Sequence, residues 1–165
     1  MNSLARSVRA NSVLILALAC VTFLGVQRHT GFIIFLTAPP ILLYQLVQLF
    51  RHRKSAPLLR AHLVAIAILA IASLVVLGVH SHLHDASRAQ ADLVAQRIEQ
   101  FQAASGRYPA SLSDVGLDSV VFRHDLMLSY LSRDNDPMLF YAATFVPFDT
   151  WHYDFSAREW TYVPS

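Results

Sequence analysis

The chain has 165 residues, of which 55% are hydrophobic and 15% are charged. Typical globular proteins carry roughly 25% charged residues, so this composition is unusual for a soluble domain of the same length. The formal net charge of +2 hides an asymmetry, because no acidic residue precedes Asp85 while seven basic residues lie in the first 79 positions. These basic residues flank apolar stretches, which argues against a nucleic-acid partner. The single cysteine, Cys20, excludes an intramolecular disulfide and a cluster of thiolate metal ligands.

Three apolar stretches occupy the first half of the chain, at about 10–26, 31–50 and 61–79. As helices they would be about 25–30 Å long, close to the hydrocarbon thickness of a bilayer. The sequence therefore predicts a membrane domain over residues 1–79 with three transmembrane helices. The first stretch also resembles a signal peptide with Arg6 and Arg9 at its basic end. Two further spans follow without a clear cleavage site, which favours an uncleaved helix.

The distribution of basic residues predicts the orientation of this membrane domain. Cytoplasmic loops of membrane proteins are enriched in Lys and Arg. The N-terminal tail and the second loop are the richer segments, whereas the tip of the first hairpin carries only Arg28. We expect a cytoplasmic N-terminus, and an odd number of spans then places residues 80–165 on the far side of the membrane. The basic residues of the two richer segments are Arg6, Arg9, Arg51, Arg53, Lys54 and Arg60.

Residues 80–104 contain neither Gly nor Pro, and their apolar residues recur at steps of three to five with polar residues between them, which predicts an amphipathic helix continuous with the third span. Gly106 is a suitable end for this helix. Ser111 and Asp114 have the spacing of a capping box and predict a short helical turn. The positions expected to form the buried stripe of the long helix are Ala86, Ala89, Leu93, Val94, Ile98 and Phe101.

The remaining sequence is rich in aromatic and branched residues and predicts strands at 126–131, 139–146, 151–155 and 159–163. In the third strand Trp151 and Tyr153 share one face with Phe155, while His152 and Asp154 share the other. The aromatic residues, Trp160 included, are expected to pack the sheet on the long helix. Residues 80–165 are thus predicted to form a small α+β domain, with a long helix on an antiparallel sheet of three to four strands.

A family resemblance is carried by the segment IEQFQAASGRYPASL at residues 98–112, which contains Gly106, Arg107, Tyr108 and Pro109. Together with a C-terminal hairpin containing Trp151, Tyr153 and Trp160, it resembles the soluble domain of the major pseudopilin of type II secretion. The resemblance implies a pilin-like fold and favours a bacterial inner-membrane protein with a periplasmic domain. Pseudopilins have a single span that carries a glutamate near its start, whereas three spans are predicted here and Leu36 stands at the comparable position. Asp134 and Asp136 are the nearest candidates for a pseudopilin-like calcium site, and a polar turn explains them better.

The most prominent polar cluster contains His80, His82 and His84, followed by Asp85. On a helix His80 and His84 face the same way and could hold one edge of a metal site, which would need further ligands. The alternatives are a collar at the membrane interface and a pH-sensitive element, because imidazoles titrate near neutrality. His124 and Asp125, as neighbours on a strand, would point apart. His152 and Asp154 have no evident nucleophile nearby, and no catalytic or cofactor motif is recognised.

These observations predict a non-catalytic inner-membrane protein, multi-pass and without a cofactor, whose periplasmic pilin-like domain binds another protein. A toxin-immunity protein or an accessory of an envelope machine would fit this description. Two alternatives stay open at this point. One is a divergent structural subunit of a type II secretion or pilus-like assembly, and the other is a metal- or pH-responsive membrane sensor. The expected partners are the lipid bilayer and a protein on the periplasmic side.

Overall fold

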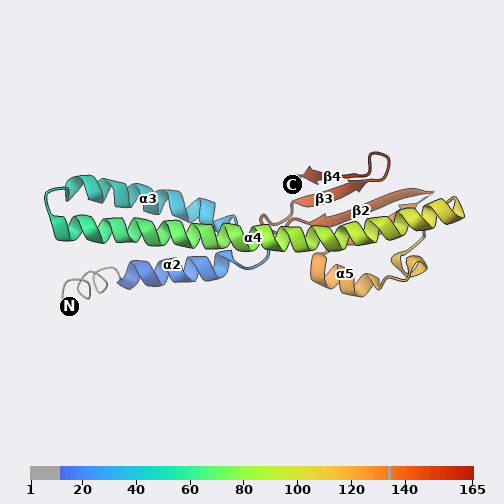
Figure 1. The fold of residues 1–165 in the computed structure, drawn as a ribbon, viewed down its shortest axis with the longest axis horizontal. Helices are drawn as coiled ribbons and strands as arrows, with labels where there is room; N and C mark the ends of the chain where they lie inside the picture. Colours follow the sequence, from blue (N-terminus) through green and yellow to red (C-terminus); the bar gives the residue numbers. More distant parts are fainter. Residues whose placement is uncertain (1–11, 134) are drawn as a thin grey trace. The chain divides into compact units, whose positions relative to one another are not determined.

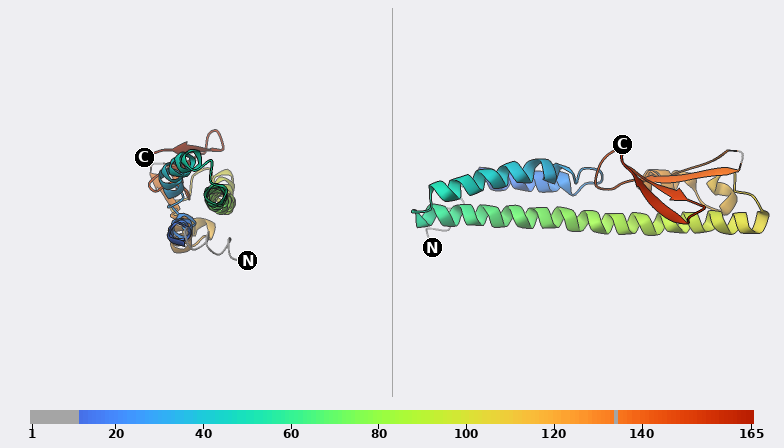
Figure 2. Two further views of the ribbon diagram at one scale, coloured as in Figure 1. Left: turned by 90° about the vertical axis from the view of Figure 1, so that its left-hand side faces the viewer. Right: turned by 90° about the horizontal axis from the view of Figure 1, so that it is seen from above.

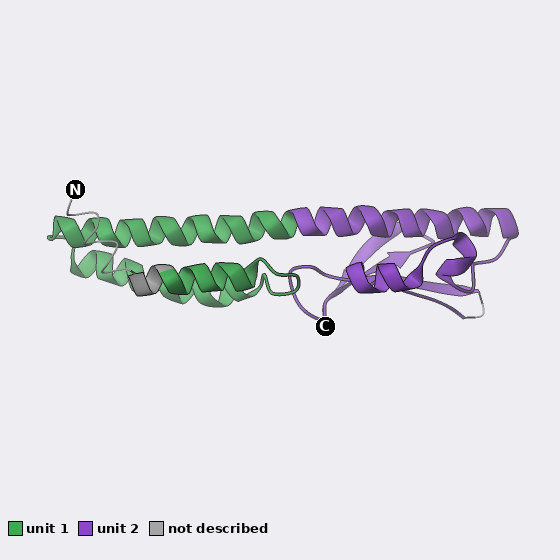
Figure 3. Cartoon of the chain, turned by 90° about the horizontal axis from the view of Figure 1, so that it is seen from below, with its two compact units in different colours: residues 1–81 green, residues 82–165 purple. Residues whose placement is uncertain are grey.

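The computed structural model describes residues 12–133 and 135–165. The chain divides into two compact units, Met1–Ser81 and His82–Ser165 (Figure 3). Helix α4, Ala56–Ser105, contributes residues to both units and is continuous over its 50 residues. This confirms the prediction that the third apolar stretch and the amphipathic segment form one helix. The helix continues because neither Gly nor Pro separates the two segments.

The first unit contains α2 (Ser12–Gly25), α3 (Ile33–Arg51) and the beginning of α4 (Figure 1). α2 and α3 contact each other, as expected for helices joined by a short link. The interior of the unit is lined by small and branched residues of α4 at helical spacing, and the large apolar side chains of the same helix point outward. The buried residues of α4 in this unit include Ala65, Leu69, Ala72 and Val76, and the exposed ones include Leu63, Val64, Ile71 and Leu74.

This arrangement differs from that in a water-soluble bundle, where polar residues cover the surface, because here large apolar side chains cover it. Small residues inside and large apolar residues outside are typical of helices packed in lipid. Two helices, α3 and α4, are long and apolar enough to cross a membrane. The prediction of three transmembrane helices is not supported. Within the described residues α2 has 14 residues, about 21 Å of helix, which is short for a hydrocarbon core of about 30 Å.

One polar contact joins α3 and α4 inside the first unit. The Gln45 side chain is 2% exposed, and its Oε1 lies 2.8 Å from His62 Nδ1. The His62 ring also stacks on that of His52, with centroids 5.9 Å apart. A buried amide without a partner would be costly in an apolar surrounding, so this hydrogen bond stabilises the pairing of the two helices.

The second unit contains the outer part of α4, the short 3-10 helix η1 (Leu112–Val115), helix α5 (Ser119–Leu126) and four strands. The strands are β1 (Ser129–Arg133), β2 (Asp136–Ala142), β3 (Thr150–Asp154) and β4 (Glu159–Val163). They form one antiparallel sheet in the order β1-β2-β3-β4. α4 runs along one face of this sheet (Figure 2). The predicted α+β class and the predicted β3–β4 hairpin are therefore confirmed.

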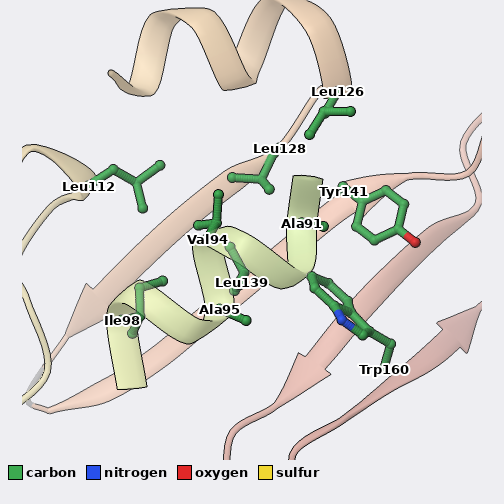
Figure 4. Packing of buried hydrophobic residues seen from close by; sticks show 10 residues of the cluster. All are labelled: Ala91, Val94, Ala95, Ile98, Leu112, Leu126, Leu128, Leu139, Tyr141 and Trp160. Atoms are coloured by element: carbon green, nitrogen blue, oxygen red, sulfur yellow. The ribbon is translucent and has the colours of Figure 1, made fainter. Parts of the chain in front are cut away.

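The core of the second unit lies between α4 and the sheet (Figure 4). The predicted helical stripe is partly wrong, since Ala86 and Ala89 are exposed and Leu93 is 48% exposed. The buried positions of α4 instead include two alanines, whose small side chains let the sheet approach the helix closely. The buried cluster consists of Ala91, Val94, Ala95, Ile98, Leu112, Leu126, Leu128, Leu139, Tyr141 and Trp160.

The boundaries of β1, β2 and β3 differ from the prediction, those of β1 and β2 most. Residues 126–128 are not strand, because α5 continues to Leu126 and Met127 then adopts a left-handed conformation with φ of 50°. Helix α5 was not predicted; its start is capped by Asp118, whose Oδ1 accepts a hydrogen bond of 2.8 Å from Val120 N. β2 begins and ends earlier than predicted. Its end is set by the bond from Ala143 N to Asp149 O, 2.8 Å, which closes the following loop.

Candidate protein-interaction surface

The sheet register assigns each strand residue to one of two faces. Tyr130, Leu139, Tyr153 and Trp160 are aligned across the four strands and point toward α4. Neighbouring residues in each strand point the opposite way. We call the opposite side the outer face, and its central residues are Leu131, Met138, Phe140, His152 and Thr161.

The inner face is attached to α4 by polar contacts as well as by packing. Tyr153 Oη donates a hydrogen bond of 2.8 Å to Glu99 Oε1, and Trp160 Nε1 donates one of 2.7 Å to Asp92 Oδ1. The guanidinium of Arg88 lies over the Trp160 ring at 5.2 Å. Directional bonds at separate points along the helix fix the sheet in register on α4. The outer face is therefore a preorganised surface, which lowers the ordering cost of binding.

The outer face exposes large apolar side chains. Leu131 is 61% exposed and Met138 is 50% exposed, and the two are direct cross-strand neighbours. Beside them Phe140 stacks on the His152 ring, with centroids 5.2 Å apart and an interplanar angle of 20°. The His152 ring is held by a contact of 3.0 Å between its Nε2 and Thr150 Oγ1. A contiguous apolar patch with an ordered aromatic at its centre is typical of protein-binding surfaces.

One end of the outer face is acidic. Arg133 pairs with Asp136 across β1 and β2, and Asp154 pairs with Glu159 across β3 and β4. Asp154 Oδ1 also accepts hydrogen bonds within the β3–β4 turn, which keeps the pKa of this carboxyl below its ordinary value. Among the described residues, these two register pairs carry three carboxylates and one guanidinium, and Arg158 of the adjoining turn is directed to Glu99.

The predicted core residue Tyr153 gives the second unit a measurable dependence on alkaline pH. Burial, and then the hydrogen bond to the Glu99 carboxylate, raise the Tyr153 pKa from its ordinary 10.0 to about 12. The folded state therefore holds this proton more tightly than the unfolded state does. Its contribution to stability is complete below pH 10 and is lost as the pH rises from about 10 to about 12.

We expect Tyr153→Phe to flatten the decline of unfolding free energy over that pH range. Burial also raises the pKa of Tyr130 and Tyr141, so part of the decline remains. Urea titrations followed by tryptophan fluorescence between pH 8 and about 11.5 would measure the slope. A variant with an unchanged slope would contradict the assignment of this proton to the Tyr153–Glu99 bond.

The histidines predicted as metal ligands meet different partners. His80 is 3% exposed and its Nε2 donates a hydrogen bond of 2.8 Å to the carbonyl of Gly25, the last residue of α2. This bond satisfies one of the carbonyls that a helix leaves open at its end. His84 packs its ring on Trp151 at 5.3 Å. Within the described residues no group of three His, Cys, Asp or Glu side chains is placed to hold a metal, so the metal site stays a prediction.

The residues that carry the family resemblance form a turn with a structural role. Gly106 ends α4 with φ of 73°, a left-handed conformation that favours glycine. Tyr108 N donates a hydrogen bond of 2.9 Å to Asn135 Oδ1, and the buried Pro109 accepts one of 2.8 Å from Tyr130 Oη through its carbonyl. Arg107 extends over the Phe101 ring at 5.9 Å.

The remaining predicted polar pairs lie apart from one another. His124 Nδ1 and Asp125 Oδ1 are 3.0 Å apart on α5, so the expectation that they point apart on a strand is wrong. His152 and Asp154 lie on the outer face, as predicted, and each is engaged by a neighbouring hydroxyl group. The half-buried Trp151 lies between His84 and Tyr162.

Sequence reasoning missed the outer face as a candidate site, although the necessary signal was present. The alternation that placed Trp151 and Tyr153 inward also places Leu131, Met138 and Phe140 outward, where apolar residues are unexpected. Comparisons of the chain with family models, with curated proteins and with solved structures give no significant match.

Proposed function

We propose that this chain is a non-catalytic membrane protein whose α+β unit binds another protein through the outer face. The observation that supports it most is the exposed Leu131–Met138 pair next to the stacked Phe140–His152 pair, on a sheet fixed to α4. Burying such a patch removes apolar area from water, and the acidic end would select partners with complementary charge. A toxin-immunity protein or an accessory of an envelope machine would use such a surface.

We further propose that the α+β unit lies in the periplasm of a bacterial cell. The loop between α3 and α4 and the adjoining helix ends carry Arg51, Arg53, Lys54 and Arg60, which favours the cytoplasmic side for this loop. If α3 and α4 both cross the bilayer, the chain after α4 is then outside, whether or not α2 crosses. The state of α2 decides only the side of the N-terminus, which we place in the cytoplasm.

Site-specific photocrosslinking tests the binding proposal. A benzophenone amino acid at position 131 would lie on the outer face, and the same group at position 93 would lie on an exposed apolar site of α4. We expect a discrete adduct with a second protein from position 131 in intact cells, and none of the same mass from position 93. Equal adducts from both positions, or none from 131 in a correctly localised protein, would contradict the proposal.

A divergent subunit of a secretion or pilus-like assembly is a second candidate. It is favoured by α4, a single helix that passes from an apolar stretch into the core of an α+β fold. Such a subunit would contact copies of itself. Adducts from position 131 with the mass of two copies of the chain would support this candidate over a different protein partner.

A further inference from the structure

The loop between β2 and β3 lies at a defined end of the second unit. Trp151, near the start of β3, has its ring centroid 5.3 Å from that of His84. Tyr153, two residues later, donates its hydrogen bond to Glu99, much further along α4. β3 therefore runs in the same direction as α4, and the loop before β3 lies where α4 enters the unit. In Figure 3 the C-terminus lies at this end of the purple unit as well.

This loop holds an aromatic ring out into solvent in a strained conformation. Phe148 is 85% exposed and has φ of 71°, which is rare for a bulky residue. The base of the loop is fixed by the adjacent Asp149, whose carbonyl accepts from Ala143 N at 2.8 Å and whose Oδ1 accepts from Ser165 N at 3.0 Å. Backbone strain that is maintained by surrounding bonds is characteristic of functional positions.

If α4 spans the bilayer, the part of α4 beside this loop is expected at the level of the lipid headgroups. The last apolar stretch ends near Val79, and His84 follows five residues later, about 7.5 Å further along the helix. The headgroup region of one leaflet is about 5–8 Å thick. Phe148 precedes Trp151, the residue at the level of His84, and so lies at the end of the second unit where α4 enters it. Residues 143–148 carry no charge.

Resting on the proposal that α4 spans the membrane, we propose that the tip of this loop, formed by Val146, Pro147 and Phe148, inserts into the phospholipid surface on the domain side. An uncharged tip with an exposed aromatic ring suits the boundary between headgroups and acyl chains, where aromatic residues concentrate. The acidic end of the outer face lies at the opposite end of β3, near Asp154. The inserted tip would fix the sheet relative to the bilayer and direct the acidic end away from it.

The depth of the loop can be measured by spin labelling of the full chain in phospholipid nanodiscs. With Cys20→Ser as background, single cysteines at positions 148, 131 and 71 would each receive a nitroxide. Position 131 is an exposed site on the outer face, and position 71 is an exposed site in the apolar part of α4. Collision rates with oxygen, which concentrates in lipid, and with a water-soluble nickel chelate would be compared. A cysteine at position 146 repeats the test if Phe148→Cys does not fold.

We expect the oxygen-to-nickel ratio at position 148 to exceed that at position 131 several-fold and to approach that at position 71. If the oxygen-to-nickel ratio at position 148 equals that at position 131, while the ratio at position 71 is high as expected in lipid, the proposal of an inserted loop is overturned. The membrane anchor would be unaffected by that result. Low collision with both reagents at 148 would mean that protein covers the tip, which also overturns the inference. A water-like ratio at position 71 would instead refute the membrane anchor itself.

Discussion

Replacing Ile98 by alanine is expected to destabilise the α+β unit by about 2–5 kcal/mol. Ile98 is fully buried in the cluster between α4 and the sheet (Figure 4). The loss combines the transfer free energy of the removed methyl and methylene groups with the cost of the cavity. Urea unfolding of the detergent-solubilised chain, followed by the fluorescence of Trp151 and Trp160, would measure the change.

Leu93→Ala is the matched control on the same helix. The amphipathic pattern alone places both residues inside, whereas in the structure Leu93 is 48% exposed. We therefore expect Leu93→Ala to change the unfolding free energy by no more than about 0.5 kcal/mol. Equal losses for the two variants would show that the sheet packs on a different face of α4.

Arginine at position 71 is expected to impair membrane insertion strongly. Ile71 is 61% exposed in the apolar part of α4, so its side chain faces outward from the first unit. In lipid an arginine near the bilayer centre costs about 2.5–3.5 kcal/mol on insertion scales, which lowers the ratio of inserted to uninserted chains by roughly 60- to 400-fold. In water the same exposed substitution would be nearly neutral.

The fraction of the chain that resists alkaline extraction from membranes would measure this effect. Leu93→Arg serves as the control, because position 93 is similarly exposed and lies in the part of α4 that belongs to the α+β unit. We expect Leu93→Arg to stay with the membrane fraction as the unaltered chain does. If both variants, or neither, were lost from the membrane fraction, the division of α4 into a lipid-facing and a water-facing part would be contradicted.

The long helix and the sheet could be predicted because their signals are local and redundant. The absence of Gly and Pro from residues 79–105 predicts the continuation of α4, and the alternation around Trp151 predicts the inward face of β3. The exact buried stripe could not be predicted, because α4 offers apolar residues on several faces. The sheet packs against the face that contains Ala91 and Ala95, where it can approach closely, and leaves Leu93 outside.

The candidate sites show a similar contrast. In the sequence, the spacing of His80 and His84 indicates a metal site. In the structure the His80 ring instead forms a hydrogen bond with the carbonyl of Gly25, 55 positions away, and no local sequence pattern predicts this contact. Helix α5 was missed because its capping residue Asp118 is a weak signal beside branched residues that favour strands. Phe148 belongs to no sequence motif. Only its positive φ and its exposure in the structure make it a candidate for a membrane contact.

The most direct test of the whole account is the side of the membrane on which the outer face lies. A single cysteine at position 93, an exposed site of the α+β unit away from the outer face, would be introduced in the Cys20→Ser background and treated with a membrane-impermeant maleimide in intact spheroplasts and after lysis. We expect full labelling before lysis, because α4 delivers the α+β unit across the bilayer and leaves residue 93 exposed to the outside. Labelling that occurs only after lysis would place the sheet in the cytoplasm and contradict the account.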